Sequence, residues 1–92
     1  MIKSFKHKGL ERFFRHDDRS GLNAQQCDRI ERLLDRLDTV PEAADMNIPG
    51  FGFHGLAGNR KVEYSVKVSG NWRITFKFEG GHALEVNLED YH

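Results

Sequence analysis

The last third of the chain alternates between apolar and polar residues with a period of two. This alternation runs through residues 64–68, 72–78 and 84–89, and short stretches that contain glycine separate the three runs. Such alternation is typical of strands that bury one face, and short interruptions containing glycine are typical of hairpin turns. We therefore predict three antiparallel strands that follow one another along the chain.

The same alternation predicts how the strands pair, because directly opposed residues must point to the same face of a sheet. A three-residue turn at 69–71 keeps apolar residues opposite apolar ones, whereas a two-residue turn would set Val68 against Arg73 and mix the faces. A turn at 80–82 has the same effect in the second hairpin. The predicted pairs are Val68–Trp72, Lys67–Arg73, Val66–Ile74, Phe78–Leu84, Lys77–Glu85 and Arg73–Glu89.

The predicted sheet has one apolar face and one polar face. The apolar face would pack against helices, and an antiparallel sheet commonly leaves its other face in water. An open polar face is therefore not in itself a functional site. The residues expected on it are Ser65, Lys67, Arg73, Thr75, Lys77, Glu85, Asn87 and Glu89.

Two helices are expected before the strands. Leu10, Phe13 and Phe14 recur at helical spacing with charged residues between them, which predicts a first helix in this region. Asn23 is a candidate N-cap of a second helix, and Gln26 follows it at the spacing of a capping box. The second helix would carry one apolar stripe, made of Cys27, Ile30, Leu33, Leu34 and Leu37.

The remaining segments are expected to be short or irregular. Residues 2–5 are compatible with a short strand, and the connection 39–50 with a helical turn from Glu42 to Met46. The glycine-rich stretch 51–60 is expected to be bent. Together these elements predict a single α+β domain over residues 1–92, with two N-terminal helices packed on one face of a small antiparallel sheet.

Composition fits one compact domain and narrows the choice of compartment. The chain has 92 residues, of which 38% are hydrophobic, enough for one core. The single cysteine, Cys27, cannot form an internal disulfide, and its place in the apolar stripe favours a buried thiol over a nucleophile. The N-terminal residues lack the apolar run of a signal peptide, and no stretch is long enough to span a membrane. We therefore expect a cytoplasmic protein.

Several kinds of active site are not indicated. The five histidines show no metal-ligand spacing. The chain has no glycine-rich phosphate loop, and no serine or cysteine stands in a nucleophile motif. We therefore expect neither a metal nor a cofactor.

Charge is balanced overall but uneven along the chain. The 14 basic and 14 acidic residues do not favour a globally basic nucleic-acid binder. Residues 3–19 and 60–77 are net basic, whereas 28–45 and 79–90 are net acidic. This asymmetry permits a basic patch for phosphate groups, although a solvated charged surface is the simpler explanation of charge alone.

The last four residues combine groups that can transfer protons. Glu89 and Asp90 carry carboxylates, Tyr91 a phenol and His92 an imidazole, and the predicted register brings Arg73 beside them. Cleavage of a phosphodiester through a neighbouring 2′-hydroxyl needs a base, an acid, and a cation or donor to stabilise the phosphorane. This set of residues offers all three, and His54 adds a second imidazole that titrates near neutral pH.

Each of these residues also has a simpler explanation. A histidine on a glycine-rich loop, such as His54, is typical of an ordinary surface position. A terminal histidine, such as His92, is commonly frayed. Arg73 opposite Glu89 is also what a cross-strand salt bridge would look like.

Three blocks of the sequence resemble the HigB toxins of bacterial toxin–antitoxin systems, which belong to the RelE/ParE-like superfamily. They are Met1 to Leu10, Asn71 to Phe76, and the terminal Glu89 to His92. The blocks match in order, and the match covers essentially the whole chain. The joint occurrence of Asn-Trp-Arg-Ile-Thr-Phe and a chain-ending Asp-Tyr-His is specific to this resemblance.

The resemblance implies a ribosome-dependent endoribonuclease that cuts mRNA in the ribosomal A site. It implies a compact fold of two helices on an antiparallel sheet whose concave face holds the site. The implied partners are the 70S ribosome, mRNA and a helix-turn-helix HigA antitoxin, with a monomeric free toxin that forms a hetero-oligomer with the antitoxin. The family's catalytic positions fall on His54, Arg73, Asp90, Tyr91 and His92, so we expect the chain to end inside its own active site.

The resemblance also suggests a role for each position. His92 and Asp90 are candidates for general base or acid, and His54 for their complementary partner. Arg73 would hold the phosphate, and Tyr91 would stack on a base or orient the substrate. Which histidine acts as base stays open. The basic residues expected to contact RNA or the ribosome are Lys6, Lys8, Arg12, Arg60, Lys61, Lys67 and Lys77.

One departure and two rival functions remain. Some relatives place a lysine three residues after the loop histidine, where this chain has Ala57, and Arg60 or Lys61 are candidates to replace its charge. The first rival is a ParE-like toxin that poisons DNA gyrase with the same fold and no nuclease chemistry. The second is an RNA-binding module without catalytic activity.

Overall fold

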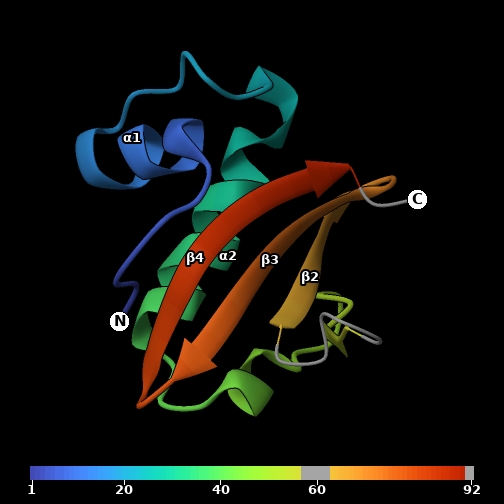
Figure 1. The fold of residues 1–92 in the computed structure, drawn as a ribbon. Coiled ribbons are helices and arrows are strands. Elements are labelled where there is room, and N and C mark those ends of the chain that lie inside the picture. Colours follow the sequence, from blue (N-terminus) through green and yellow to red (C-terminus); the bar gives the residue numbers. More distant parts are fainter. Residues whose placement is uncertain (57–62, 91–92) are drawn as a thin grey trace.

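The computed structural model describes residues 1–56 and 63–90. Within these residues the chain forms two α-helices and one antiparallel sheet with strand order β1-β2-β3-β4, which confirms the predicted α+β class. Figure 1 shows α2 crossing behind the sheet and α1 lying beside the β4 edge. The elements are α1 (Lys8–His16), α2 (Cys27–Thr39), β1 (His54–Gly55), β2 (Glu63–Ser69), β3 (Trp72–Glu79), β4 (His82–Asp90), and 3₁₀ helices at Ala24–Gln26 and Ala43–Met46.

The core lies between α2 and the sheet. Opposite the helix, Ile74 and Phe76 of β3 and Val86 of β4 are completely buried. No helix within the described residues is long and apolar enough to cross a membrane. The predicted apolar stripe of α2 is confirmed, because each of its residues is at most 1% exposed: Cys27, Ile30, Leu33, Leu34 and Leu37.

The start of α2 differs in detail from the predicted capping box. The Asn23 side chain accepts a hydrogen bond from the Gln25 N–H at 2.9 Å, so Asn23 is an N-cap, but of the 3₁₀ turn that leads into α2. The Gln26 side chain does not reach back to Asn23. It donates instead to the Ser69 Oγ at 2.9 Å and thereby ties the start of the helix to the end of β2.

Helix α1 is capped by a histidine. The Nδ1 atom of His7 accepts a hydrogen bond from the Leu10 N–H at 3.1 Å and satisfies a backbone donor that the first turn leaves unpaired. The helix ends at Asp17, which has a φ of 54°, and the Asp17 N–H donates to the Phe13 carbonyl at 3.0 Å. Leu10 and Phe13 of α1 are buried in the same core as α2.

The hairpin between β2 and β3 has a shorter turn than predicted. The two pairs predicted further along the strands are correct, but Trp72 lies opposite Ser69 and not opposite Val68. The turn holds only Gly70 and Asn71, and the strand bulges at Val68 to absorb the extra residue. The bulge keeps the apolar and polar faces separate despite the two-residue turn.

The second hairpin also has a two-residue turn, at glycines 80–81, both of which have positive φ. Phe78 pairs with Ala83 instead of the predicted Leu84, and Leu84 lies opposite Lys77. The predicted placement of Leu84 on the core face is therefore wrong. Ala83 takes the core position and is fully buried.

A second bulge, at residues 85–86, restores the predicted register, so that Arg73 lies opposite Glu89. Glu85 has a φ of 50°, a left-handed conformation that non-glycine residues seldom adopt. Two contacts hold it there. Its carboxylate lies 2.7 Å from the Lys77 Nζ, and its N–H donates to the Ser4 Oγ at 2.9 Å.

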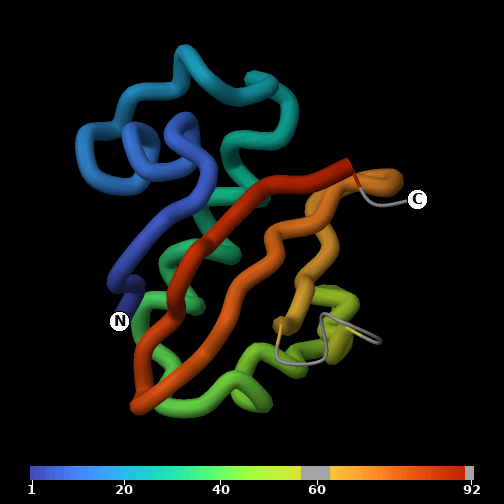
Figure 2. The backbone as a smooth tube through the Cα atoms, in the orientation of Figure 1, coloured from blue at the N-terminus to red at the C-terminus, as the bar shows by residue number. Residues whose placement is uncertain are grey.

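The N-terminal segment lies along the outer edge of β4, as the tube in Figure 2 shows. Ile2 and Phe5 form isolated parallel bridges with Ala83 and Val86, where the sequence suggested a short strand. The Lys6 N–H also donates to the Val86 carbonyl at 2.8 Å. These bonds cover backbone groups of β4 that an open edge would leave unpaired.

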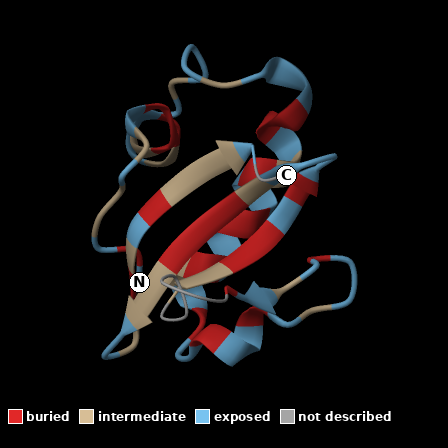
Figure 3. Ribbon diagram, turned by 45° about the vertical axis from the view of Figure 1, so that its right-hand side comes forward, coloured by how far each residue is buried: buried red, intermediate tan, exposed pale blue. Residues whose placement is uncertain are grey.

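The polar face is less open than predicted. Ser65 is 3% exposed and Thr75 only 1%. Figure 3 shows the buried colour continuing along the middle of the sheet. Both side chains are small and lie between longer side chains of neighbouring strands, and β1 adds a fourth strand beside Ser65. Only the margins of this face meet solvent freely.

Strand β1 lies in the glycine-rich stretch, where the sequence predicted only a bent backbone. Gly50 and Gly52 have φ values of 91° and 61°, in the left-handed region that glycine adopts without strain. Phe51 between them is buried, and its carbonyl accepts the Lys67 N–H at 2.7 Å. These two bends bring His54 alongside β2.

We expect acidification to destabilise the fold through His7. Burial lowers the pKa of His7 below its ordinary value of 6.5. As pH falls through 6.5, the unfolded chain binds a proton that the folded chain resists, so the free energy of unfolding falls; above 6.5 this contribution is constant. His7→Ser keeps a capping oxygen but does not titrate. Denaturant unfolding at about pH 7.5 and about pH 5.5 should show a larger loss for the wild type than for the variant. Equal losses would contradict this role of His7.

We expect Gly52→Ala to destabilise the β1 region. A Cβ at this position would lie 3.1 Å from the Lys67 Cβ, and its left-handed φ would cost a non-glycine residue about 1–2 kcal/mol. Gly55→Ala is the matched control, because Gly55 has ordinary φ and open space around its Cβ position. Urea unfolding should show a clear loss for Gly52→Ala and almost none for Gly55→Ala. Similar losses would show that neither strain nor crowding acts at Gly52.

Candidate functional site

The polar face of the sheet carries side chains in rows that run across the strands. Opposed residues of antiparallel strands point to the same face, so the register alone defines these rows. The face lies on the side of the sheet away from α2 (Figure 1). The central row is His54, Ser65, Thr75 and Asn87; one neighbouring row is Lys67, Arg73 and Glu89; the other is Glu63, Lys77 and Leu84.

Arg73 is anchored to the turn at the end of its own strand. Its Nη1 donates to the Gly70 carbonyl at 3.0 Å and to the Trp72 carbonyl at 3.3 Å. No ion pair between Arg73 and Glu89 is present among the described residues, so the predicted alternative of a cross-strand salt bridge is not observed. A half-buried guanidinium fixed in this way is a preformed donor for phosphate oxygens.

His54 lies on the same face at the edge strand β1. It is exposed to solvent and lies opposite Ser65 in the central row. It is two strands and one row away from Arg73, a Cα separation on the order of 10 Å. The preceding residue, Phe53, stacks on Tyr64 with ring centroids 5.6 Å apart, which secures β1 against the sheet. A phosphodiester group fits between an imidazole and a guanidinium at this spacing.

The carboxylate in the row of Arg73 belongs to Glu89. The Thr75 hydroxyl donates a hydrogen bond of 2.5 Å to the Glu89 Oε2. Asp90 lies opposite Trp72, so the alternation of the strand turns it to the other face from Glu89. The structure thus brings His54 and Arg73 together on the polar face and places Asp90 on the alternate side of β4.

The last two predicted catalytic residues, Tyr91 and His92, lie outside the described residues. The same holds for Arg60 and Lys61, predicted to contact RNA, and for Ala57, the position at which the chain departs from some relatives. Their roles remain predictions from the sequence.

The basic residues predicted to contact RNA lie in two places. Lys67 and Lys77 are on the polar face, Lys67 in the row of Arg73. A hydrogen bond to Glu85, reinforced by its charge, raises the pKa of Lys77, and the same contact lowers the pKa of Glu85. Because this ion pair is exposed, a phosphate group can compete with Glu85 for the ammonium.

The other basic candidates lie on the N-terminal segment and α1. Lys6 and Lys8 are exposed on either side of His7, and Arg12 lies 3.6 Å from the Asp18 carboxylate. This group is beyond the β4 edge of the sheet, away from His54 at the opposite edge. Lys6 nonetheless lies near Glu85, the ion-pair partner of Lys77, because its charge contributes to the lowered pKa of Glu85.

The chemistry of the face is that of acids, bases and hydrogen-bond donors. Within the described ranges 1–56 and 63–90, no group of three or more His, Cys, Asp or Glu residues is arranged to hold a metal ion. Arg73 can stabilise negative charge, while His54 and Glu89 can exchange protons. These are the functions that a transphosphorylation through a 2′-hydroxyl requires.

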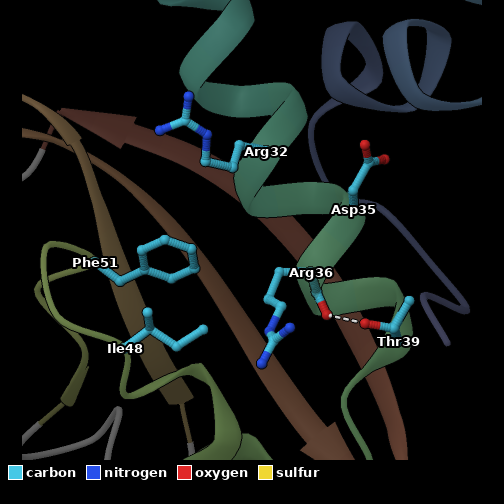
Figure 4. Close-up of a pocket in the computed structure, with 6 residues that line it drawn as sticks. All are labelled: Arg32, Asp35, Arg36, Thr39, Ile48 and Phe51. Carbon is cyan, nitrogen blue, oxygen red and sulfur yellow. Dashed lines mark hydrogen bonds between the residues drawn. The ribbon is translucent and has the colours of Figure 1, made fainter.

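A shallow pocket of about 540 Å³ lies elsewhere, between α2 and the segment 48–51. Figure 4 shows Arg32 and Arg36 extending from α2, with Ile48 and Phe51 forming the facing wall. The pocket contains none of the residues of the three rows. Its lining combines two arginines, a carboxylate, a hydroxyl and apolar groups but has no imidazole, so we place the candidate site on the polar face and not in this pocket.

Two residues of the face carry a contact that the sequence did not single out. Thr75 and Glu89 were both predicted to lie on the polar face, and Glu89 was among the proton-transfer groups at the end of the chain, but the family resemblance selected Asp90 and not Glu89, and Thr75 was not a candidate. The available signal was the strand alternation, which puts Glu89 and not Asp90 on the face of Arg73. The hydrogen bond between Thr75 and Glu89 had no sequence signal, because the two residues are diagonal and not directly opposed.

Comparisons with known proteins agree over the whole chain. Residues 3–92 match a family described as the RelE-like toxin of type II toxin–antitoxin system HigB. A protein named Endoribonuclease HigB from Proteus vulgaris is 47% identical over 92 residues, which is 100% of both chains. A protein named Toxin HigB-1 from Vibrio cholerae serotype O1 (strain ATCC 39315 / El Tor Inaba N16961) is 33% identical over 93 residues, covering 99% of this chain and 98% of the relative.

The family match spans the helices, the sheet and the polar face that carries His54 and Arg73. Both relatives match along nearly their full lengths. The chain belongs to the HigB family of RelE-like toxins of type II toxin–antitoxin systems.

Proposed function

We propose that this toxin is an endoribonuclease that cleaves mRNA in the A site of the 70S ribosome and so inhibits translation and growth. The observation that carries the proposal is the full-length, 47% identical relative named as an endoribonuclease. The polar face supports it, because Arg73 and His54 lie on one side of the sheet and hydrogen bonds hold the Arg73 guanidinium in place. Toxins of type II systems pair with an antitoxin, and we propose a helix-turn-helix HigA-type protein for this role.

The proposed reaction is an attack of the 2′-hydroxyl on the adjacent phosphorus. A base removes the hydroxyl proton, the 2′-oxygen forms a bond to phosphorus, and the bond to the 5′-oxygen breaks. That oxygen takes a proton from an acid, leaving a 2′,3′-cyclic phosphate and a free 5′-hydroxyl. Arg73 would stabilise the charge on the phosphorane, and preorganised donors of this kind act most strongly on such transition states.

The proton donors and acceptors are assigned to the residues that the family resemblance indicates. His54, Asp90 and His92 are the candidates for acid and base, and Tyr91 would stack on a base or orient the substrate. The roles of Asp90, Tyr91 and His92 are inferred from the resemblance of the sequence to the family.

The balanced charge of the toxin supports the proposal that the ribosome presents the substrate. A net charge of zero gives little general attraction to free RNA. The basic residues around α1 and those on the polar face would contact ribosomal RNA. We propose that the free toxin is a monomer that forms a hetero-oligomer with its antitoxin and acts in the cytoplasm.

We expect purified translating ribosomes to support mRNA cleavage by the wild type. Arg73→Ala should lower the single-turnover rate by about 10²–10³, as loss of an electrostatic donor typically does. His54→Ala and His92→Ala should each lower it by about 10²–10⁴, the range of general acid–base catalysis. Glu79→Gln, an exposed residue at the far end of β3, is the control and should cleave normally.

The outcomes separate the rival functions. Normal cleavage by all three variants would refute the assignment of these residues. If the toxin cleaved free mRNA as fast as mRNA on translating ribosomes, the proposed dependence on the ribosome would be wrong. Inhibition of DNA gyrase without RNA cleavage would identify a ParE-like toxin, and harmless expression without the antitoxin would favour a binding module.

A further inference from the structure

The register identifies an additional carboxylate for the site. Arg73 lies opposite Glu89, and the neighbouring Trp72 lies opposite Asp90. Side chains alternate along a strand, so Glu89 shares the face of Arg73 while Asp90 points to the other side. In the row of Arg73, the group able to accept a proton is therefore Glu89.

The position of the Glu89 carboxylate is set by Thr75. The two oxygens are 2.5 Å apart, at the short end of the range for a hydroxyl that donates to a carboxylate. Thr75 is 1% exposed, and its neighbours Ile74 and Phe76 are fully buried. A β-branched side chain has restricted χ1 freedom, and the burial of Thr75 restricts it further, which favours a fixed donor.

The two charges of this row do not neutralise each other. Arg73 bonds through Nη1 to the carbonyls of Gly70 and Trp72, whereas Glu89 is held by Thr75. A cation and a base that bond only to each other would both be lost to catalysis. Each therefore has at least one contact other than its cross-strand neighbour, and both lie on the face where the phosphate and the 2′-hydroxyl would lie.

We propose that Glu89 is a catalytic residue that accepts the proton of the 2′-hydroxyl, and that Thr75 is the residue that positions it. This inference rests on the proposed nuclease function. In the step, the O2′–H bond breaks, the proton goes to a Glu89 carboxylate oxygen, and the freed electron pair forms the O2′–P bond. The P–O5′ bond then breaks and its oxygen takes a proton from an imidazolium of the site, for which His54 is on the same face. Solvent returns both groups to their starting protonation states.

The test compares single-turnover cleavage on ribosomes at saturating toxin for three variants. Glu89→Gln should lower the rate by about 10²–10⁴ without weakening ribosome binding. Thr75→Val, which removes only the hydroxyl donor, should lower the rate about tenfold to a hundredfold, because the carboxylate is no longer held in position. Thr75→Ser restores the donor and should stay within about threefold of the wild type.

The pH dependence provides a readout that a purely structural role of Thr75 would not change. The hydroxyl stabilises the charged carboxylate, so its loss makes Glu89 easier to protonate. The acidic limb of the pH–rate profile should therefore move to higher pH in Thr75→Val and return in Thr75→Ser. Thr39→Val makes the same chemical change on α2, and Glu79→Gln makes it at the exposed far end of β3, beside the turn; both should leave rate and profile unchanged.

The results distinguish this inference from the proposed function. Wild-type-like rates and profiles for Thr75→Val and Glu89→Gln, alongside an inactive Arg73→Ala, would overturn the roles of Thr75 and Glu89 and leave the nuclease intact. A wild type that cleaves nothing on ribosomes would overturn both. Thermal unfolding monitors the fold of Thr75→Val. If that variant unfolds at the assay temperature, Glu89→Gln decides, because Glu89 is only half-buried.

Discussion

The packing of α2 against β3 and β4 determines which side of the sheet can meet a substrate. The apolar stripe of the helix and the facing residues Ile74, Phe76 and Val86 exclude solvent completely. One face is thereby committed to the core, and only the polar face remains for chemistry. The same packing makes that face rigid, because Arg73 and Thr75 alternate along β3 with two of the most buried side chains in the molecule. Functional groups held on such an element keep their geometry better than groups on a loop.

The elements with a clear period were predictable from the sequence, whereas the departures from regular pairing were not. The α2 stripe repeats at helical spacing and the three longer strands alternate strictly, so both follow from burial alone. The bulges at Val68 and at 85–86 arise because the glycine-containing turns close with two residues while the core demands a register that fits three. The pattern of apolar positions alone does not tell whether the preferred turn length or the preferred core register determines the pairing. Strand β1 has only two residues and leaves no period to detect.

The candidate site, too, was predictable only in part. Alternation and register placed Arg73 opposite Glu89 correctly, and the family resemblance selected His54 and Arg73 as residues of interest. The partners of these side chains did not follow, because several acceptors lie within reach of one guanidinium and the choice among them depends on small differences in free energy. The turn carbonyls bind Arg73, and Thr75 binds Glu89. The placement of Tyr91 and His92 remains a prediction from the sequence.

The N-terminal segment along β4 also imposes an order on folding. Its contacts join residues about 80 positions apart, as in the Met1 amine that donates to the Gly81 carbonyl. Such contacts require the closure of a very long loop and are among the slowest to form. On a growing polypeptide, Ile2 can bond to Asp38 of α2 but cannot bridge to β4 until Ala83 has been synthesised. We therefore expect this edge of the sheet to close late, after α2 and the earlier strands have formed the core.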